Sequence, residues 1–396
     1  MRRRQFIKTA MASGAGLLIL PGGAHAGKKN EIEVEPPTGP TLFVGANQKY
    51  RDIKSAIADL PAAGGTIRVL GGTYEIAESI QVPSNTALIG EGPERTKLRL
   101  ASKVFAHVIT NANHQKGDRD ILIKDLAIIG NLDSGGFPPR GKPTQGNDNC
   151  RGVFFEHVKN AKVEGCFITE TGTNSFLASA SDRIAVVGNT EKFCFHCLNF
   201  TNCTNCIVAR NKTIRKWSGE SPYFNNTSRC EVYDNYVEGV GMDGMALDFN
   251  SSHNVVHDNT IVGSALSGIV IQRGSHHNRI ERNTIKGNGR YKNNPTGRLD
   301  GIFLSSASNN QIIENECVDD QPAPTQRYGI NISNAECKDN ELRRNLLKGN
   351  ATGPIHDMGT GTAITVRDDK WRAMAGHDEI HPRHLAFRKH FGQQPS

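Results

Sequence analysis

The sequence lacks long apolar runs and a strong net charge, and it has few aromatic residues. Only 6% of its 396 residues are aromatic, and none of its segments after Ala26 approaches the roughly 18 apolar residues of a membrane-spanning helix. Of the 47 basic residues four lie at or before Ala26, a segment without any acid, so 43 basic residues face 40 acidic ones in the remainder. The nearly equal numbers of basic and acidic residues predict no nucleic-acid partner. The lack of a long apolar run predicts no membrane span. A hydrophobic content of 37% argues against disorder, and 41 glycines argue against a helical protein.

The segment that ends at Ala26 has the features of a signal peptide. Three arginines at positions 2–4 precede a largely apolar stretch at 10–20, and Ala-His-Ala at 24–26 forms a small-x-small cleavage motif. The run RRRQFIK resembles the twin-arginine consensus, with Phe6 and Lys8 at the expected offsets. An ordinary Sec signal with a basic start is the alternative. We expect a periplasmic or secreted protein that meets the twin-arginine export machinery, and the sequence leaves its oligomeric state open.

An asparagine recurs at regular spacing through the second half of the chain. The positions are Asn211, Asn235, Asn259, Asn283, Asn315 and Asn345. The first three intervals are equal, at about 24 residues, and the last two are longer, which is typical of a repeat that accepts loop insertions. A second row stands just ahead of the first, at Cys206, Cys230, Asn254, Asn278, Asn310 and Asn340. Strands led by glycine follow variable loops, at 243–249, 267–273, 300–306 and 328–334. One repeat therefore contains a strand, an Asn turn, a second strand, a variable loop, a Gly-led strand and a short turn.

This repeat predicts a solenoid. Each strand alternates apolar and polar residues, and a single coil cannot bury its apolar face, whereas coils stacked about 4.8 Å apart can. Leucine-rich repeats of similar length would need Leu-rich consensus positions, which are absent. We predict an all-β, right-handed parallel β-helix over residues 27–353. Residues 50–65 have apolar residues at helical spacing and are predicted to form an N-terminal capping helix, and residues 354–396 a C-terminal cap or tail.

The start GGTIRVLGGTYEI, the Asn-turn coils and the loops before the Gly-led strands resemble the pectate-lyase-like superfamily over most of residues 40–350. The resemblance implies a polysaccharide lying on the outer face of the Gly-led strands, between the long loops that enter them. The outward positions would be Glu156, Asn199, Asn225, Asp248, Gln272, Ser305 and Ser333. The loops at 131–150 and 286–299 bring six basic residues: Arg140, Lys142, Lys286, Arg290, Lys292 and Arg298. Inserts on one side of a solenoid usually mark a binding face, although solvated surface charge is the alternative.

A closer match lies within residues 239–274. GMDGMALDF, HDNTIVG and SGIVIQRG resemble the catalytic module of mannuronan C5-epimerases. This resemblance implies that Asp248 is catalytic and that Gln272 and Arg273 belong to the same site. Where that family has an Asp-Pro-His triplet this chain has a Ser-Pro-Tyr triplet ending at Tyr223, and Ser305 stands near the position of the family's catalytic lysine.

Lyases and C5-epimerases both remove the proton beside a uronate carboxylate. The reaction needs a cation to neutralise that carboxylate and a base to take the proton. Arg273 is the candidate cation, with Ca²⁺ as a possible cofactor, and Tyr223 or His196 is the candidate base. The substrate-binding candidates are Gln272, Arg298, Lys292, Arg290 and Asn225.

Two other functions stay open. Asp243, Asp248 and Asp300 could supply the acid and base of an inverting glycoside hydrolase of the polygalacturonase type, whose carboxyl groups lie roughly 6.5–9.5 Å apart. Asp243 and Asp300 each precede a glycine, which is also ordinary turn chemistry. A non-catalytic, carbohydrate-binding accessory protein of the periplasm is the third alternative. We favour the lyase or epimerase on an acidic glycan.

All nine cysteines follow Ala26. The motifs CFHC at 194–197 and CTNC at 203–206 superficially resemble a metal site. The short spacer with a strand inside it would spread these residues along a coil, so we predict no metal site. Cys206 and Cys230 occupy the same ladder position one repeat apart, within disulfide range for neighbouring parallel strands. Because export leads to an oxidising compartment, we predict a candidate disulfide between them.

Overall fold

The computed structural model describes residues 31–131, 150–214, 219–291 and 296–365. Met1–Glu31 and Ile32–Ser396 are separate compact units, and the fold below is that of the second. The signal peptide assigned to 1–26, the loop carrying Arg140 and Lys142, and Lys292 lie outside the described residues.

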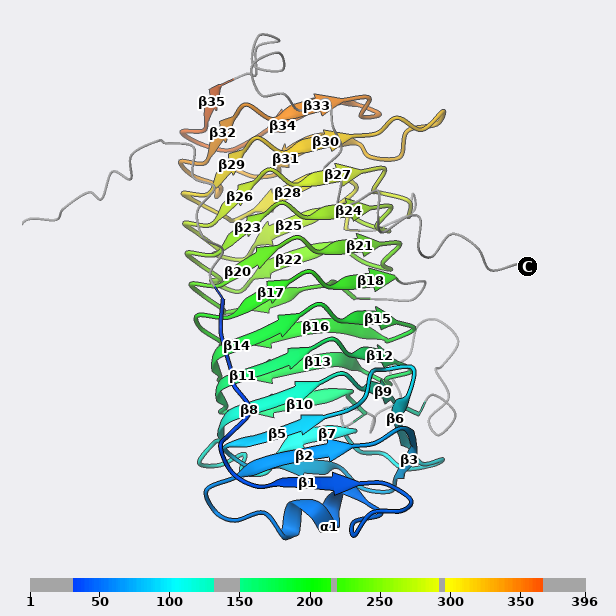
Figure 1. The fold of residues 1–396 in the computed structure, drawn as a ribbon. Helices are drawn as coiled ribbons and strands as arrows, with labels where there is room; N and C mark the ends of the chain where they lie inside the picture. Colours follow the sequence, from blue (N-terminus) through cyan, green and yellow to red (C-terminus); the bar gives the residue numbers. More distant parts are fainter. Residues whose placement is uncertain (1–30, 132–149, 215–218, 292–295, 366–396) are drawn as a thin grey trace, which may run out of the picture. The chain divides into compact units, whose positions relative to one another are not determined.

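The described residues form three long sheets of parallel strands (Figure 1). Sheet A contains β1 (Thr41–Val44), β2 (Gly65–Val69), β5 (Thr86–Ile89), β8 (Arg119–Lys124), β11 (Lys159–Glu164), β14 (Asp182–Val187), β17 (Ile207–Ala209), β20 (Glu231–Tyr233), β23 (Val255–His257), β26 (Arg279–Glu281), β29 (Gln311–Ile313), β32 (Glu341–Arg343) and β35 (Ala363–Thr365). Sheet B contains β3 (Gly72–Ile76), β6 (Thr96–Leu100), β9 (Ala127–Ile129), β12 (Phe167–Thr169), β15 (Thr190–Lys192), β18 (Lys212–Ile214), β21 (Tyr236–Glu238), β24 (Thr260–Val262), β27 (Thr284–Lys286), β30 (Glu316–Val318) and β33 (Leu346–Lys348). Sheet C contains β4 (Ile80–Val82), β7 (Ile109–Asn111), β10 (Val153–Glu156), β13 (Asn174–Ser179), β16 (His196–Thr201), β19 (Tyr223–Asn225), β22 (Met245–Asp248), β25 (Ile269–Gln272), β28 (Ile302–Ser305), β31 (Tyr328–Ile332) and β34 (Gly353–Asp357).

Each coil adds one strand to each sheet. From β2 onward, neighbours within a sheet are three strands apart in the sequence, as in β19, β22 and β25 of sheet C. The predicted order of strand, Asn turn, strand, variable loop and Gly-led strand corresponds to sheets A, B and C in turn. The predicted parallel β-helix is confirmed, and the Gly-led row is sheet C.

The core lies inside the coils because alternate residues of every strand point inward. In sheet C the phenylalanines of successive coils stack on one another, with ring centroids 5.3–5.8 Å apart; they are Phe155, Phe176, Phe200 and Phe224. All four rings are fully buried. Burying an aromatic side chain of this kind contributes about 1.5–3 kcal/mol, so the stack stabilises four consecutive coils.

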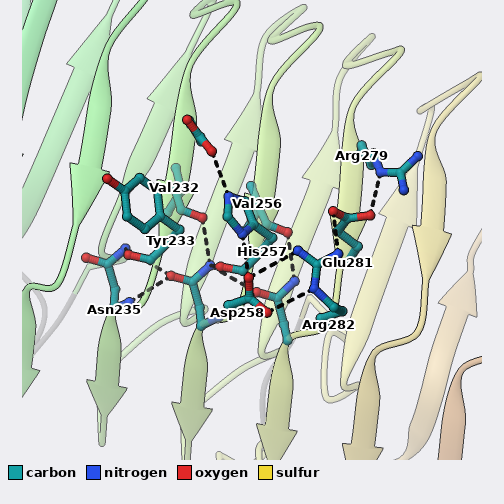
Figure 2. Close-up of polar contacts among 12 residues, drawn as sticks. Val232, Tyr233, Asn235, Val256, His257, Asp258, Arg279, Glu281 and Arg282 are labelled. Carbon is teal, nitrogen blue, oxygen red and sulfur yellow. Dashed lines mark hydrogen bonds and ion pairs between the residues drawn. The ribbon is translucent and has the colours of Figure 1, made fainter. Parts of the chain in front are cut away.

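The predicted Asn ladder is confirmed by hydrogen bonds along the stack. Asn235 donates from its backbone nitrogen and from Nδ2 to Oδ1 of Asn259, at 3.0 and 2.9 Å. Asn259 bonds to Asn283 in the same way, and its Nδ2 also reaches the backbone oxygen of Val232 at 2.9 Å. Figure 2 includes Asn235 and Val232 at one step of this ladder. The ladder satisfies buried backbone groups that a turn would otherwise leave unpaired.

The predicted disulfide between Cys206 and Cys230 is not formed. Both are free and buried cysteines. Cys230 Sγ accepts a hydrogen bond from the backbone nitrogen of Cys206 at 3.2 Å, and the Cys206 thiol donates to the backbone oxygen of Thr204 at 3.2 Å. Cys230 therefore occupies the acceptor position that Asn254 Oδ1 fills one coil later. Burial raises the pKa of the Cys206 thiol well above its ordinary value, which disfavours the thiolate.

The two ends of the stack differ from the sequence-based expectation. Instead of a helix over 50–65 there is α1 (Ile53–Ala58), which begins at the N-cap Asp52 and buries Ile53 and Ala56 beside β1, β2 and β4. Residues assigned to a C-terminal cap or tail contribute β34 and β35 to sheets C and A. Among the described residues no helix is long and apolar enough to cross a membrane.

The segment before β1 covers an apolar stripe on the outer face of sheet A. Ile32 and Val34 are buried there, and Figure 1 shows this dark blue segment crossing the strands of the sheet. The stripe consists of Ala87, Ile89, Leu122, Ala185, Val187, Ile207, Ala209 and Tyr233. It explains why these strands are apolar on both faces, a pattern that alternation alone does not predict.

Candidate functional site

A cleft of about 290 Å³ lies on the outer face of sheet C. Its walls come from the strands β13, β16, β19, β22 and β25 and from the loops that enter them. The lining residues are Asn174, His196, Leu198, Asn199, Glu220, Tyr223, Met242, Asp248, Gln272, Arg273 and Arg298. Seven of the residues singled out in the sequence are therefore brought together: Asp248, Arg273, Tyr223, Gln272, Arg298, His196 and Asn199.

Strand register explains this grouping. Asn225 on β19 is opposite Asp248 on β22, and Gln272 on β25 is opposite Ser305 on β28. Asn199 was expected in this column but lies in the neighbouring one, opposite Tyr223. Thr201 is the residue opposite Asn225, because β16 continues past Asn199 to end at Thr201.

The Asp248 carboxylate accepts hydrogen bonds from several residues around the cleft. Its Oδ2 accepts hydrogen bonds from Arg273 Nη1 at 2.7 Å, Gln272 Nε2 at 3.1 Å and Tyr223 Oη at 3.2 Å. Its Oδ1 accepts from the backbone nitrogen of Phe249 at 2.9 Å. Asp248 lies on the outer face, as expected, yet these neighbours leave it only 1% exposed. A carboxylate that accepts four hydrogen bonds is well suited to orient its donors.

Arg273 presents its guanidinium to the solvent. The side chain is 55% exposed although it pairs with Asp248, and its Cζ lies 4.7 Å from the ring centroid of Phe249. The Phe249 ring is 42% exposed and lies against Arg273, which lines the cleft. The ion pair and the ring contact fix the guanidinium while leaving part of it free for an anion.

Tyr223 and His196 are the proton-transfer candidates of the cleft. Burial, followed by the neighbouring Asp248 carboxylate, raises the pKa of Tyr223 well above its ordinary value. The phenol is therefore protonated at neutral pH and suits a proton donor better than a base. His196 lies at the start of β16, where its ring contacts Phe195 edge to face, with centroids 4.7 Å apart.

Arg298 bridges the cleft to a buried carboxylate. Its Nη1 donates to Gln272 Oε1 at 3.0 Å, and its Nη2 lies 3.2 Å from Asp243 Oδ2. Asp243 is fully buried, and its Oδ1 accepts from the backbone nitrogen of Ser267 at 2.9 Å. Burial raises the pKa of Asp243 to about 6, although Arg298 opposes this rise. Asp243 thus holds Arg298 in place and does not itself line the cleft.

Asp300 belongs to a separate network. Its two oxygens accept from Arg327 Nε at 3.0 Å and Nη2 at 2.8 Å, and also from Asn331 Nδ2 at 2.9 Å. It is fully buried and is not part of the cleft. The structure therefore does not bring Asp243, Asp248 and Asp300 together around one opening.

The remaining binding candidates lie outside the cleft lining. Arg290 is exposed and its Nε would lie 3.4 Å from a Cβ at Gly263, beyond the end of β24. Lys286 pairs with Glu316 at 3.3 Å across sheet B. Asn225 is opposite Asp248 but is not a lining residue. Charge in a loop near the cleft is therefore a poor guide to which side chain enters it.

Four lining residues were missed in the sequence: Asn174, Leu198, Glu220 and Met242. Asn174 and Leu198 come from β13 and β16, where the repeat is shorter than in the later coils, as the pairing of Asn174 with His196 shows. Extending the register backward with that shorter spacing would have found Asn174, whereas it pairs Leu198 with the core residue Phe176. Glu220 and Met242 lie in loops before Gly-led strands. The sequence around them does not indicate which way their side chains point.

The described residues include no group of three or more His, Cys, Asp or Glu side chains placed to hold a metal ion. Cys194 is buried between β15 and β16, and Cys203 and Cys206 are both buried between β16 and β17. In the cleft the Asp248 oxygens already accept four hydrogen bonds and Asp243 lies beneath Arg298, so these residues do not fit a Ca²⁺ site.

A second polar cluster lies on the outer face of sheet A (Figure 2). His257 is 6% exposed and bonds through Nδ1 to Asp258 at 2.7 Å and through Nε2 to Glu231 at 2.9 Å. Burial alone would lower the pKa of His257, but these two carboxylates outweigh burial and raise the pKa to about 9. Arg282 completes the cluster with two bonds to Asp258, at 3.0 and 3.1 Å. The network ties three consecutive coils together.

Residues 196–370 match the family model for the right handed beta helix region. The fold is a right-handed parallel β-helix. A search of curated proteins found no match to this chain.

Three solved structures illustrate the likeness of fold. The A-module of a mannuronan C-5 epimerase from Azotobacter vinelandii matches with a TM-score of 0.53 and 16% identity, covering 79% of this chain and 94% of that one. The DFA-IIIase from Arthrobacter chlorophenolicus without its lid matches with a TM-score of 0.58 and 14% identity, covering 85% and 96%. The N-terminal fragment of bacteriophage Phi29 gene product 12 matches with a TM-score of 0.62 and 13% identity, covering 73% and 53%. At these identities the likeness establishes the fold alone.

Proposed function

We propose that this right-handed β-helix protein acts on a polysaccharide, as a lyase or C5-epimerase of an acidic, uronate-containing glycan. The observation that carries the proposal is the half-exposed guanidinium of Arg273, which is paired with Asp248. It lines the same cleft as the Tyr223 phenol and the His196 imidazole. The name of the Azotobacter neighbour, a mannuronan C-5 epimerase, agrees with this chemistry.

The first step is removal of the C5 proton. In a uronate this proton lies beside the carboxylate, whose negative charge opposes carbanion formation. Arg273 neutralises that charge, and such preorganised electrostatic stabilisation supplies about 10²–10³ of rate in comparable sites. His196 takes the proton from C5, because Tyr223, whose pKa is raised by burial and by Asp248, stays protonated.

The second step decides between the two reactions. In a lyase the bond from C4 to the glycosidic oxygen breaks, a C4–C5 double bond forms, and Tyr223 gives its proton to the departing oxygen. In a C5-epimerase Tyr223 instead gives its proton to C5 from the opposite face, and no bond of the chain is broken. Both steps leave the phenolate to recover a proton from solvent or from the imidazolium.

The inverting hydrolase has less support. Its two carboxyl groups must face a shared opening with room for a water molecule. Asp248 accepts four hydrogen bonds, and Asp243 and Asp300 are fully buried beneath Arg298 and Arg327. A non-catalytic carbohydrate-binding protein would use the same cleft without proton transfer.

The test is to incubate the purified mature protein with a panel of uronate glycans and follow three products. A lyase yields ultraviolet absorbance from the new double bond, and an epimerase in D₂O yields deuterium at C5 without absorbance. New reducing ends without absorbance would replace this proposal by the hydrolase, and binding without any product would replace it by the accessory protein.

Arg273→Ala should lower turnover about 100-fold or more on the active glycan. Arg183→Ala is the matched control, because Arg183 is also exposed and also has a positive φ, 57° against 50°. It lies outside the cleft and should retain full turnover. Equal loss in both variants, or none in either, would contradict the assigned role of Arg273.

Export to the periplasm is part of the same proposal and rests on the sequence of residues 1–26. Replacing Arg3 and Arg4 together by lysine preserves the charge of the segment and should abolish export by the twin-arginine route. Fractionation of cells that express the full chain measures the outcome. Undiminished periplasmic protein would favour the Sec route.

A further inference from the structure

Two turns at the end of sheet C contain one residue more than their neighbours. Three residues separate Asp248 from Ser252, and three separate Gln272 from His276, whereas two separate the equivalent Asn225 from Ser228 and Ser305 from Ser308. The extra residue occurs in consecutive coils, and these are the coils that carry Asp248 and Gln272. The extra residue lies in the turn after each strand and lengthens that turn on the cleft side of the coil.

The extra residue gives each turn two successive left-handed residues. The φ angles are 46° and 62° at Phe249 and Asn250, and 50° and 82° at Arg273 and Gly274. In the part of the chain that the structure describes, no other turn has two successive residues with such angles. An aromatic residue in this conformation is uncommon and strained. Strain of this kind is often retained where it serves a site.

The two turns pack against each other. A Cβ at Gly274 would lie 2.3 Å from Asn250 Oδ1, and the φ of 82° at Gly274 is one that favours glycine. This contact sets the Phe249 turn under the Arg273 turn, with the guanidinium over one face of the Phe249 ring and the backbone nitrogen of Phe249 on Asp248. The ring remains 42% exposed beside Arg273, which lines the cleft.

We propose that Phe249 is a sugar-binding subsite, which stacks on the pyranose ring next to the one processed in the cleft. The inference rests on the proposed action on a glycan. A pyranose presents axial C–H groups on one face, and an exposed aromatic ring is the surface that such a face packs on, because both are apolar. The ring lies beside the cation that would bind the carboxylate of the same or the adjoining sugar. The subsite therefore favours oligosaccharides that extend past the reacting residue.

The experiment compares Phe249→Asn with Phe249→Tyr. Asparagine tolerates a positive φ, so Phe249→Asn removes the ring without adding strain. It should raise KM, and the dissociation constant for a non-reacting oligouronate, about tenfold or more, because the apolar contact between the ring and the sugar is lost. Its Tm should stay equal or rise. Phe249→Tyr should restore wild-type binding because it keeps the ring.

Phe193→Asn is the matched control. Phe193 has a φ of 55°, is 36% exposed, and has Lys192 Nζ 4.9 Å from its ring centroid, but Lys192 does not line the cleft, whereas Arg273, the cation over Phe249, does. It should bind and turn over glycan as the wild type does. Wild-type KM and affinity in Phe249→Asn would overturn the subsite while leaving the proposed function intact. Failure of the wild type to bind any glycan would instead remove the proposed function and the subsite together.

Discussion

Asp248 illustrates how much a single outer residue of a β-helix depends on its neighbours one coil away. The sequence placed it on the outer face beside Gln272 and Arg273, and the structure adds Tyr223 and the backbone of Phe249 as hydrogen-bond donors. With both oxygens occupied, the carboxylate keeps Arg273 and Tyr223 in position. We therefore assign it a positioning role in place of the catalytic role that the family resemblance implied.

Asp248→Asn tests this role. The amide loses the ion pair with Arg273 and brings an N–H₂ group against donors, so turnover should fall about 100-fold or more, as expected when a proton-transfer site loses its alignment. Steady-state kinetics on the active glycan and thermal melts provide the measurement. A positioning role predicts that part of the loss appears in KM, because Arg273 becomes mobile.

Asp300→Asn is the control for burial. It removes the charge of a fully buried aspartate that pairs with Arg327 outside the cleft. We expect a lower Tm with nearly normal turnover of the folded enzyme. Full activity in Asp248→Asn would end the assignment of this cleft as the active site.

The Asn ladder is the element that connects one coil to the next on the side opposite to sheet C. Each ladder asparagine accepts two hydrogen bonds from the preceding coil and donates to the following one, as Asn259 does for Asn235 and Asn283. The side chain is thus part of the backbone hydrogen bonding of the turn. Its loss leaves buried groups without partners, which costs more than the bond itself contributes.

Asn259→Ala should lower the free energy of unfolding by about 2–4 kcal/mol, because several buried partners are orphaned at once. Asn345→Ala at the end of the ladder should cost less, since Asn345 is only partly buried and one of its neighbours is a terminal coil. Urea unfolding of both variants measures the difference. Equal effects would mean that the ladder contributes little beyond its own turn.

At the scale of the whole molecule, stability comes from contacts between adjacent coils, as in other solenoids. The phenylalanine stack inside and the His257 cluster outside are two such contacts, and each spans consecutive coils. When a titratable group links coils in this way, the free energy of unfolding depends on the protonation state of that group.

His257 predicts a pH dependence of stability. Its pKa is raised from 6.5 to about 9 in the folded protein, so the folded state binds the proton more tightly than the unfolded chain. The stabilisation is fully present below pH 6.5 and is lost as pH rises through about 9. The pKa of Asp258 is lowered by His257 and Arg282 despite burial. Its ionised carboxylate therefore stabilises the fold at neutral pH, and this stabilisation is lost in acid.

Melting temperatures across pH 6 to 10 measure this effect. The wild type should lose stability toward pH 9, and His257→Gln should be less stable at pH 6 with a flatter profile over the same range. His253→Gln, which replaces an exposed histidine in a nearby turn, should follow the wild type. A wild-type profile that rises between pH 6.5 and 9 would contradict the assignment.

The sequence by itself determined the stacking of coils and the closeness of Asp248, Gln272 and Arg273. A constant repeat length specifies which side chains are one coil apart, and parallel strands then bring them within contact distance. The same reasoning predicted the Asn ladder. These predictions needed no loop geometry, because they follow from regular spacing and from the need to bury an apolar face.

Only the tertiary structure decided which candidates enter the cleft. Arg298 enters it and Arg290 does not, although both come from the same loop, because loops have no period from which a direction can be read. Asp243 and Asp300 are buried beneath arginines that come from later loops of the chain. Phe249 lies outside the core because β22 ends at Asp248 and Phe249 begins a turn with a positive φ, where the alternation of strand side chains no longer applies.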